Sequence, residues 1–197
     1  MKISFVIGNG TSRKDINLSK LLDRGKVYGC NALYREFTPH YLIAVDTKMI
    51  REITNSKYHL LNQVWTNPNP YSKKIQKINL FESSMGWSSG PSALWLASKH
   101  KPNIIYILGF DYRGLGINHE FVNNIYAGTQ NYKKKEDRAT YHGNWARQTA
   151  NIIGRNPDIK YVRVRKEKDN FIPDGLKVFS NLEHITVKEF VKRFDGK

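Results

Sequence analysis

The chain has 197 residues, of which 40% are hydrophobic and 25% are charged, and its formal net charge is +15 at pH 7. This length suits one domain with a buried core, and the composition excludes a disordered chain. No run of about 18 apolar residues is present and the first residues lack the apolar segment of a secretory signal, so neither a membrane span nor secretion is expected. The single cysteine, Cys30, fits a reducing, cytoplasmic setting.

The positive charge makes anionic partners expected, such as nucleic acid, a nucleotide, an acidic glycan or an anionic membrane surface. The cations are spread along the chain and are not gathered in one tail, so an ordinary solvated basic surface explains them equally well. Their main groups are Lys73–Lys74, Lys133–Lys135, Arg163–Lys168 and Lys188–Arg193.

Apolar segments typical of strands alternate with segments typical of helices. The strand candidates are Ile3–Ile7, Lys26–Asn31, Tyr41–Asp46, Gln63–Asn67, Asn103–Asp111 and Ile159–Arg165. Several are almost continuously apolar, as strands covered on both faces of a parallel sheet are. The helix candidates are Asn17–Asp23, Thr47–Asn55, Pro91–Lys101, Gly143–Gly154 and Thr186–Phe194. This alternation predicts one α/β domain over residues 1–197, a Rossmann-like three-layer sandwich with a mainly parallel sheet.

Two further segments complete this interpretation. Residues 112–141 have no clear periodicity and are rich in Gly, Asn, Tyr and Lys, which indicates a lid-like loop or insertion. Near the end of the chain, the amphipathic stretch Val187–Phe194 is expected to pack on the sheet.

Small polar residues follow nearly every predicted strand. Ligands bind at the carboxyl ends of the strands in open α/β sheets, so these turns are candidates for a nucleotide site. Glycines allow close backbone approach, and a helix N-terminus favours an anion. The candidates are Gly8, Asn9, Gly10, Thr11 and Ser12 after the first strand, Asn31 after the second, Asp46 after the third, Ser89 and Gly90 at a helix start, and Asp111 and Tyr112 after Asn103–Asp111.

Each turn also has a structural explanation. The Gly-Asn-Gly turn at residues 8–10 is neither a GxGxxG fingerprint nor a P-loop, and such turns are common as plain tight turns. Ser89 can simply cap a helix, and Asp46 and Asp111 can cap turns as readily as they ligate a metal. With one cysteine and no i, i+4 histidine pair, no metal site is expected. His142 precedes a predicted helix and is a candidate general base.

The motifs VIGNGTS, VYGCNALY and SSGPSALWLASKHKPNIIYILGFDY occur in this order along the chain. Together they resemble the bacterial sialyltransferases of glycosyltransferase family 42, and the related family of archaeal 6-hydroxymethylpterin diphosphokinases and bacterial motility accessory factors. The stretch ATYHGNWARQTANIIGRNPDIKYVRV matches that pattern in layout, with a histidine before a helix and then a strand. The resemblance runs in islands from Met1 to about Arg165, and Thr11 stands where the sialyltransferases have a proline.

The resemblance implies a donor site for a CMP-activated sugar and no bound cofactor. Asn9, Gly10 and Ser12 would line the donor phosphate and ribose, and Asn31 would contact the cytosine or phosphate side. Ser89 and Gly90, which open the predicted helix Pro91–Lys101, would also bind the donor.

The implied reaction is a single inverting transfer of sialic acid without a metal. His142 would deprotonate the acceptor hydroxyl. Tyr112 and Tyr126 would stabilise the departing phosphate, because a leaving CMP in a dry pocket needs hydrogen-bond donors.

Two alternatives stay open. One is a basic nucleic-acid-binding accessory protein without catalysis, of the phage type, supported by the +15 charge and by the interleaved cations and aromatic residues at Asn131–Arg147. The other is a pterin-type diphosphokinase relative, in which Asp46 and Asp111 would hold magnesium on ATP phosphates.

Overall fold

The computed structural model describes residues 1–195, so the last two residues of the predicted domain lie outside the described part. Eight strands form a single all-parallel sheet in the order β5-β4-β3-β2-β1-β6-β7-β8. The strands are β1 (Ile3–Ile7), β2 (Lys26–Cys30), β3 (Tyr41–Ile43), β4 (Val64–Thr66), β5 (Asn79–Leu80), β6 (Ile104–Leu108), β7 (Lys160–Arg165) and β8 (Leu182–Thr186). The helices are α1 (Thr47–Asn55), α2 (Ser89–Lys99), α3 (Gly143–Gly154) and α4 (Val187–Asp195).

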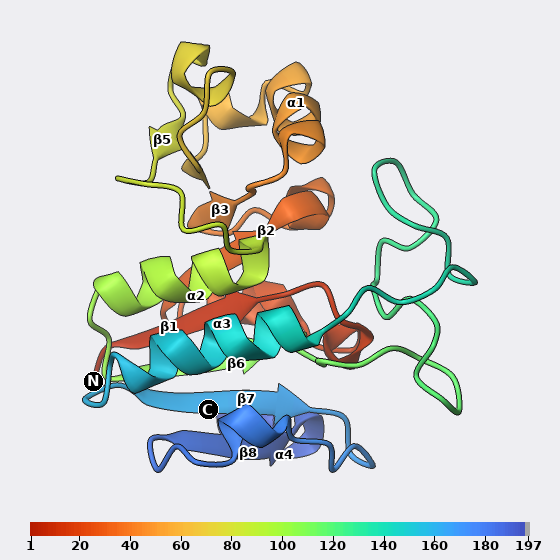
Figure 1. Cartoon of the computed structure of the whole chain (residues 1–197). Helices are drawn as coiled ribbons and strands as arrows, with labels where there is room; N and C mark the ends of the chain where they lie inside the picture. The colour runs from red at the N-terminus through yellow and green to blue at the C-terminus, as the bar shows by residue number, and fades with distance from the viewer. Residues whose placement is uncertain (196–197) are drawn as a thin grey trace.

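Both faces of the sheet are covered, which gives the predicted α/β sandwich of three layers. Helices α2 and α3 lie side by side on one face (Figure 1). The other face is covered by α1, by a 3-10 turn at Leu18–Leu21 and by α4. In β1, Phe5 and Ile7 join the core on this second face and Val6 joins the core on the first, as the alternation of side chains along a strand requires. The central strands are therefore mostly apolar, because neither of their faces meets water.

The predicted helix Asn17–Asp23 is the main error in the elements. Only a 3-10 turn forms, at Leu18–Leu21, where the Asn17 side chain accepts a hydrogen bond from Ser19 N. The chain turns directly after Leu21, where Arg24 N and Gly25 N both donate to Leu21 O at 3.1 and 3.2 Å, and it then enters β2.

The sequence pattern missed two edge strands, β5 and β8. Strand β5 has only two residues, which is too short to show a period. Strand β8 is half-buried and carries Glu183 and His184, so it lacks the apolar character of the central strands. The expectation that Val187–Phe194 packs on the sheet is confirmed by α4.

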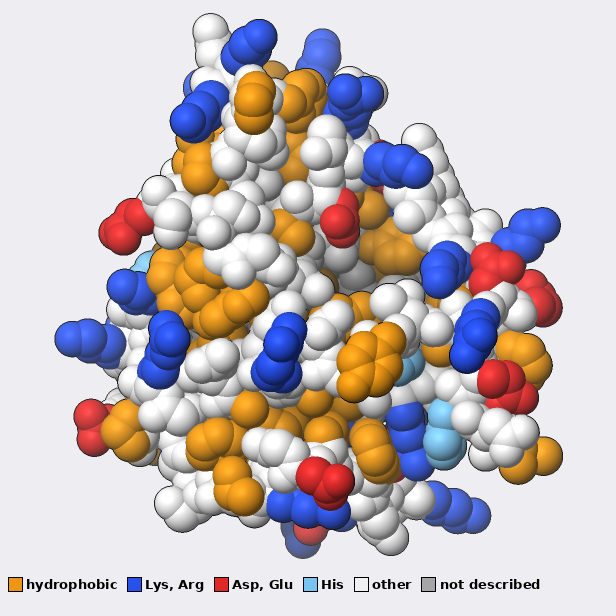
Figure 2. Space-filling view, in the orientation of Figure 1, with side chains coloured by type: hydrophobic (Ala, Val, Ile, Leu, Met, Phe, Trp, Pro, Cys, Tyr) orange, Lys and Arg blue, Asp and Glu red, His pale blue; other side chains and the backbone are white. Residues whose placement is uncertain are grey.

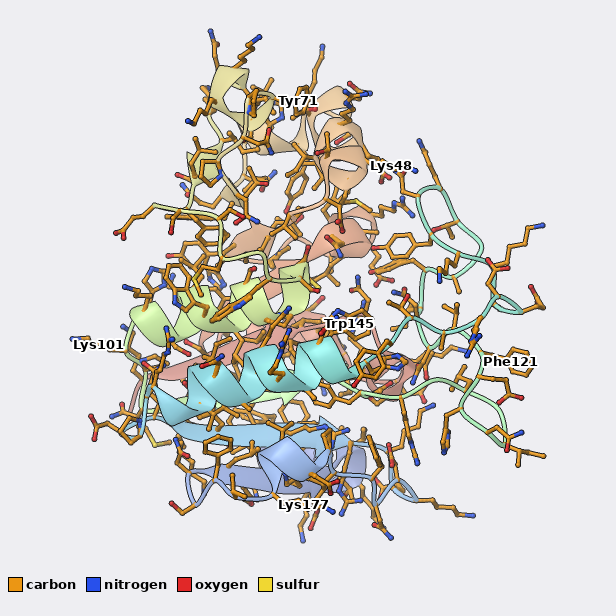
Figure 3. All side chains as sticks on the ribbon, viewed as in Figure 1. Lys48, Tyr71, Lys101, Phe121, Trp145 and Lys177 are labelled. Atoms are coloured by element: carbon orange, nitrogen blue, oxygen red, sulfur yellow. The ribbon has the colours of Figure 1, made fainter. Side chains whose placement is uncertain are left out.

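The segment 112–141 projects beyond the carboxyl ends of the strands (Figure 1). It contains short antiparallel bridges that pair Phe121 with Leu115 and Arg138, and Phe121 is labelled in Figure 3. The segment is also bonded to the domain, because Ile125 N donates to Asn9 O at 2.8 Å. Within residues 1–195, no helix combines the length and the apolar character needed to cross a membrane.

Helix α4 supplies a testable part of the core. Phe190 is 1% exposed and its ring lies 5.5 Å from that of Tyr106 and 6.3 Å from that of Phe5. We expect Phe190→Ala to lower the free energy of unfolding by about 3–5 kcal/mol, because it removes apolar contacts and leaves a cavity. Lys192→Ala, at an exposed position of the same helix, is the control and should change it by less than about 0.5 kcal/mol. Equal losses in urea unfolding would contradict this role of α4.

Candidate functional site

The site lies where the strand order of the sheet reverses. Strand β1 has β2 on one side and β6 on the other, and the chain reaches β6 only after building the β2 to β5 half. Such a point leaves a crevice outside the carboxyl ends of the strands. A cavity of about 350 Å³ occupies it, lined from the ends of β1, β2 and β6 and from the starts of α2 and α3. The surface is hollowed there, between α1 and α3 (Figure 2).

Most of the predicted site residues meet at this cavity. Those that line it are Gly8, Asn9, Gly10, Asn31, Ser89, Gly90, Asp111, Tyr112 and His142, together with Asp46. Thr11, Ser12 and Tyr126 are not among the lining residues.

The two glycines after β1 are required by the contact between two turns. Gly8 N donates to Leu108 O at 2.8 Å and Gly10 N donates to Gly109 O at 2.9 Å. A Cβ atom on Gly8 would lie 2.6 Å from Gly109 O, and one on Gly10 would lie 2.5 Å from Asp111 Oδ2. No larger residue fits without moving the β6 turn, so these glycines bring the ends of β1 and β6 together at the cavity.

Two asparagine side chains leave buried acceptors at the cavity. Asn9 is 8% exposed, and its Nδ2 donates to Cys30 O at 3.4 Å and to the Tyr132 hydroxyl at 3.3 Å. Asn31 has a left-handed backbone with φ 54°. The Oδ1 atoms of both residues are buried, and neither has a hydrogen-bond partner in the described chain. A buried acceptor without a partner costs about 1–3 kcal/mol, so a ligand that brings donors here would recover that free energy.

The start of α2 faces the same cavity. Ser88, the N-cap residue, accepts a hydrogen bond from Trp145 Nε1 at 2.8 Å, and Ser89 Oγ accepts one from Val45 N at 3.1 Å. The two hydroxyls therefore tie α2 to α3 and to the end of β3 and do not cap the helix. The first backbone N–H groups of a helix have no partner within it, and they carry the positive end of its dipole. This arrangement suits an anion such as a phosphate.

A buried arginine, Arg163, holds Asp111 and the turn around it. From the sequence, Arg163 belongs to one of the cation groups that an ordinary solvated surface would explain. Arg163 is 1% exposed, and it donates to Phe110 O at 2.8 Å, Asp111 O at 3.2 Å and Phe171 O at 2.9 Å. Burial lowers the pKa of this guanidinium, and the charge of Asp111 opposes the shift. Strand β7 reads KYVRVR and carries two other cations, so the sequence holds no signal that distinguishes Arg163 from them.

His142 stands immediately before α3 and lines the cavity. Its ring lies 5.0 Å from that of Trp145 in an edge-on contact. Burial lowers the pKa of His142 and the carboxylate of Asp111 raises it, with burial the larger effect. The imidazole is therefore neutral at pH 7, which is the form that can accept a proton.

The two candidate tyrosines lie differently. Tyr112 has a left-handed backbone with φ 57°, and its hydroxyl donates to Thr149 Oγ1 on α3 at 2.9 Å. Burial raises the pKa of Tyr112 to about 12. Tyr126 lies outside the cavity, because its hydroxyl is bonded to Glu36 and to Arg13. Tyr112 therefore lines the cavity, whereas Tyr126 belongs to a hydrogen-bond network outside it.

Thr11 and Ser12 turn away from the cavity in a similar manner. Thr11 binds Asn123 Oδ1 through its backbone N–H at 3.0 Å, and its hydroxyl accepts a hydrogen bond from Lys166 at 2.9 Å. Ser12 N donates to Asp111 Oδ2 at 3.1 Å. Both residues therefore hold neighbouring segments of the site in place.

The charge at the cavity differs from that of the whole chain. Asp46 and Asp111 line it, and Arg113 is its one Lys or Arg within residues 1–195. Arg113 is paired with Asp169 at 2.6 Å. The part of the chain that the structure describes contains no group of three or more His, Cys, Asp or Glu residues that could hold a metal ion.

Comparison with family models, with curated proteins and with solved structures finds no match to this chain.

The buried Arg163 gives a prediction for the site. We expect Arg163→Met to lower the free energy of unfolding by about 2–4 kcal/mol, because three carbonyls lose their donor and two of these hydrogen bonds are buried. Lys160→Met on the same strand removes only an exposed pair with Glu183 and should cost less than about 1 kcal/mol. Urea unfolding of both variants measures the difference, and an equal effect would contradict the role of the buried guanidinium.

Proposed function

We propose that the chain is a nucleotide-sugar-dependent glycosyltransferase, similar to the sialyltransferases, that uses a CMP-type donor. The observation that carries the proposal is the set of groups at one cavity: buried acceptors without partners, a helix N-terminus and a neutral histidine. A nucleotide sugar has chemistry for each of them. It brings hydroxyl and amino donors for the acceptors and a phosphate for the helix.

The donor's orientation follows from these contacts. The phosphate lies at the N-terminus of α2, beside Ser89 and Gly90. The ribose hydroxyls and the exocyclic amine of cytosine are donors, and Asn9 Oδ1 and Asn31 Oδ1 accept from them. The cavity volume is at the lower end of the range of about 300–1,000 Å³ that is usual for ligand pockets.

The reaction is a displacement at the anomeric carbon of the donor sugar. The acceptor hydroxyl oxygen forms a bond with that carbon while the bond from the carbon to the phosphate oxygen breaks. The hydroxyl proton passes to His142, and CMP leaves with the electron pair and so carries an additional negative charge. The N–H groups at the start of α2 stabilise that charge as it develops.

Removal of the base tests the proposal. We expect CMP to raise the melting temperature of the wild-type protein and of His142→Ala by the same amount, while His142→Ala lowers the transfer rate from CMP-sialic acid by about 10²–10⁴-fold. His119→Asn is the control, because His119 is an exposed histidine of the 112–141 segment with φ 59°, a backbone that asparagine tolerates. A protein that no nucleotide stabilises at millimolar concentration would refute the proposed function.

The pH profile is a second test of His142. The neutral imidazole is the active form and burial holds its pKa below the ordinary 6.5. We therefore expect the acid-side decline of kcat/KM to have its midpoint below pH 6.5. Asp111→Asn removes the charge that raises this pKa, so the decline should move to still lower pH. A midpoint above pH 6.5, or one that Asp111→Asn leaves in place, would contradict His142 as the base.

A diphosphokinase is the second candidate, because Asp46 and Asp111 both line the cavity. These carboxylates would hold magnesium on the phosphates of ATP. The same melting experiment separates the candidates: stabilisation by ATP with magnesium and not by CMP would favour the diphosphokinase.

A further inference from the structure

Two tryptophans line the cavity, and the proposed donor contacts use neither of them. Trp87 is half-buried and precedes α2, and it follows Gly86, whose φ is +64°. Trp145 lies in the first turn of α3 (Figure 3), and its Nε1 donates to Ser88 Oγ at 2.8 Å. This hydrogen bond fixes the Trp145 ring on the α3 side of the cavity. We refer to Trp87 and Trp145 together as the aromatic wall of the cavity.

Polar groups with free hydrogen-bonding capacity lie around this wall. The carboxylate of Asp111 uses one oxygen for Ser12 N, and that of Asp46 makes no side-chain bond to cap α1. The His142 ring is in contact with Trp145. A flat apolar surface edged by carboxylates and an imidazole matches a sugar ring, which has an apolar C–H face and hydroxyl groups at its rim.

The local charge selects against an anionic acceptor at this wall, whereas the phosphate of the proposed donor lies at the N-terminus of α2. Asp46 and Asp111 carry negative charge, and the guanidinium of Arg113 is engaged by Asp169 at 2.6 Å. A carboxylated or phosphorylated ring here would meet like charge in a partly desolvated cavity, where the repulsion is stronger than in water.

We propose that Trp87 and Trp145 bind the ring of an uncharged sugar, which is the acceptor of the transfer. The role of this sugar as the acceptor rests on the proposed function. The net charge of +15 then has no part in the choice of acceptor. The base must reach the acceptor hydroxyl, and His142 is in contact with Trp145. A ring stacked on this wall therefore presents its hydroxyls to the base, while the nucleotide lies at Asn9, Asn31 and α2.

Saturation-transfer NMR tests the proposal without any transfer reaction. The probes are the methyl glycosides of glucose, galactose, mannose and N-acetylglucosamine at millimolar concentration, with methyl glucuronide and single-stranded oligo(dT) as anionic probes. We expect at least one neutral glycoside to receive saturation through its C–H face. Trp87→Ala should weaken its binding about tenfold while the CMP melting shift stays unchanged.

Matched variants separate a binding role from a folding defect. Trp95→Phe is the control, because Trp95 lies on α2 in contact with Phe81 and Lys99 and does not line the cavity. It should bind the glycoside as the wild type does. Trp145→Phe keeps a ring but loses the bond to Ser88, and it should weaken glycoside binding less than Trp87→Ala weakens it.

The proposal is overturned if no neutral glycoside binds. It is also overturned if Trp87→Ala removes the melting shift with CMP, because the cytosine ring would then be the group that stacks on Trp87. Tighter binding of the glucuronide or of oligo(dT), lost in Trp87→Ala, would also overturn it in favour of an acidic glycan or a nucleic acid. Glycoside binding without any nucleotide shift would support the sugar site and refute the proposed function, so the two failures are distinguishable.

Discussion

The close contact between the turns after β1 and β6 is the constraint on which the site depends. Gly8 and Gly10 pack against the backbone of Gly109 with no room for a Cβ atom. Strand pairing holds β1 and β6 in register up to Ile7 and Leu108, and the glycines let the turns beyond the two strands come into contact as well. Because the turns touch, Asn9 and Asp111 reach one cavity from strands about a hundred residues apart in the chain.

Each of these turns is also held by a buried arginine. Arg13 Nε donates to Gly8 O at 2.7 Å, and Arg163 Nε donates to Phe110 O at 2.8 Å. Both side chains are less than 5% exposed, so their charges are costly to bury, and each guanidinium makes several hydrogen bonds within the domain. A backbone carbonyl in a tight turn that no strand partner can reach is satisfied in this way. Rigidity of the turns, and with it the placement of the asparagine acceptors, thus depends on two cations that never reach the cavity.

The pattern of apolar runs predicted the central strands and all four α-helices to within about two residues, because burial is encoded directly in residues such as those of Ile3–Ile7. Small residues at the strand ends predicted where a cavity would form. The positions of Tyr126 and Arg163 could not be predicted, because each depends on partners brought together by the sheet: Glu36 for the tyrosine and Phe110 for the arginine. Edge strand β8 was missed since an edge needs no continuous apolar run.

The charge of a chain and the charge of its site are separate quantities. A net +15 suggests anionic partners, yet the cavity is lined by two carboxylates and by one arginine that is already paired. Exposed cations act over about 8 Å at physiological ionic strength, so lysines on the outer surface contribute little inside. In the proposed function, a nucleotide phosphate in this cavity would therefore be held by helix N–H groups rather than by lysines. Such groups keep their orientation as charge develops on a leaving phosphate, whereas a flexible lysine would have to be ordered first.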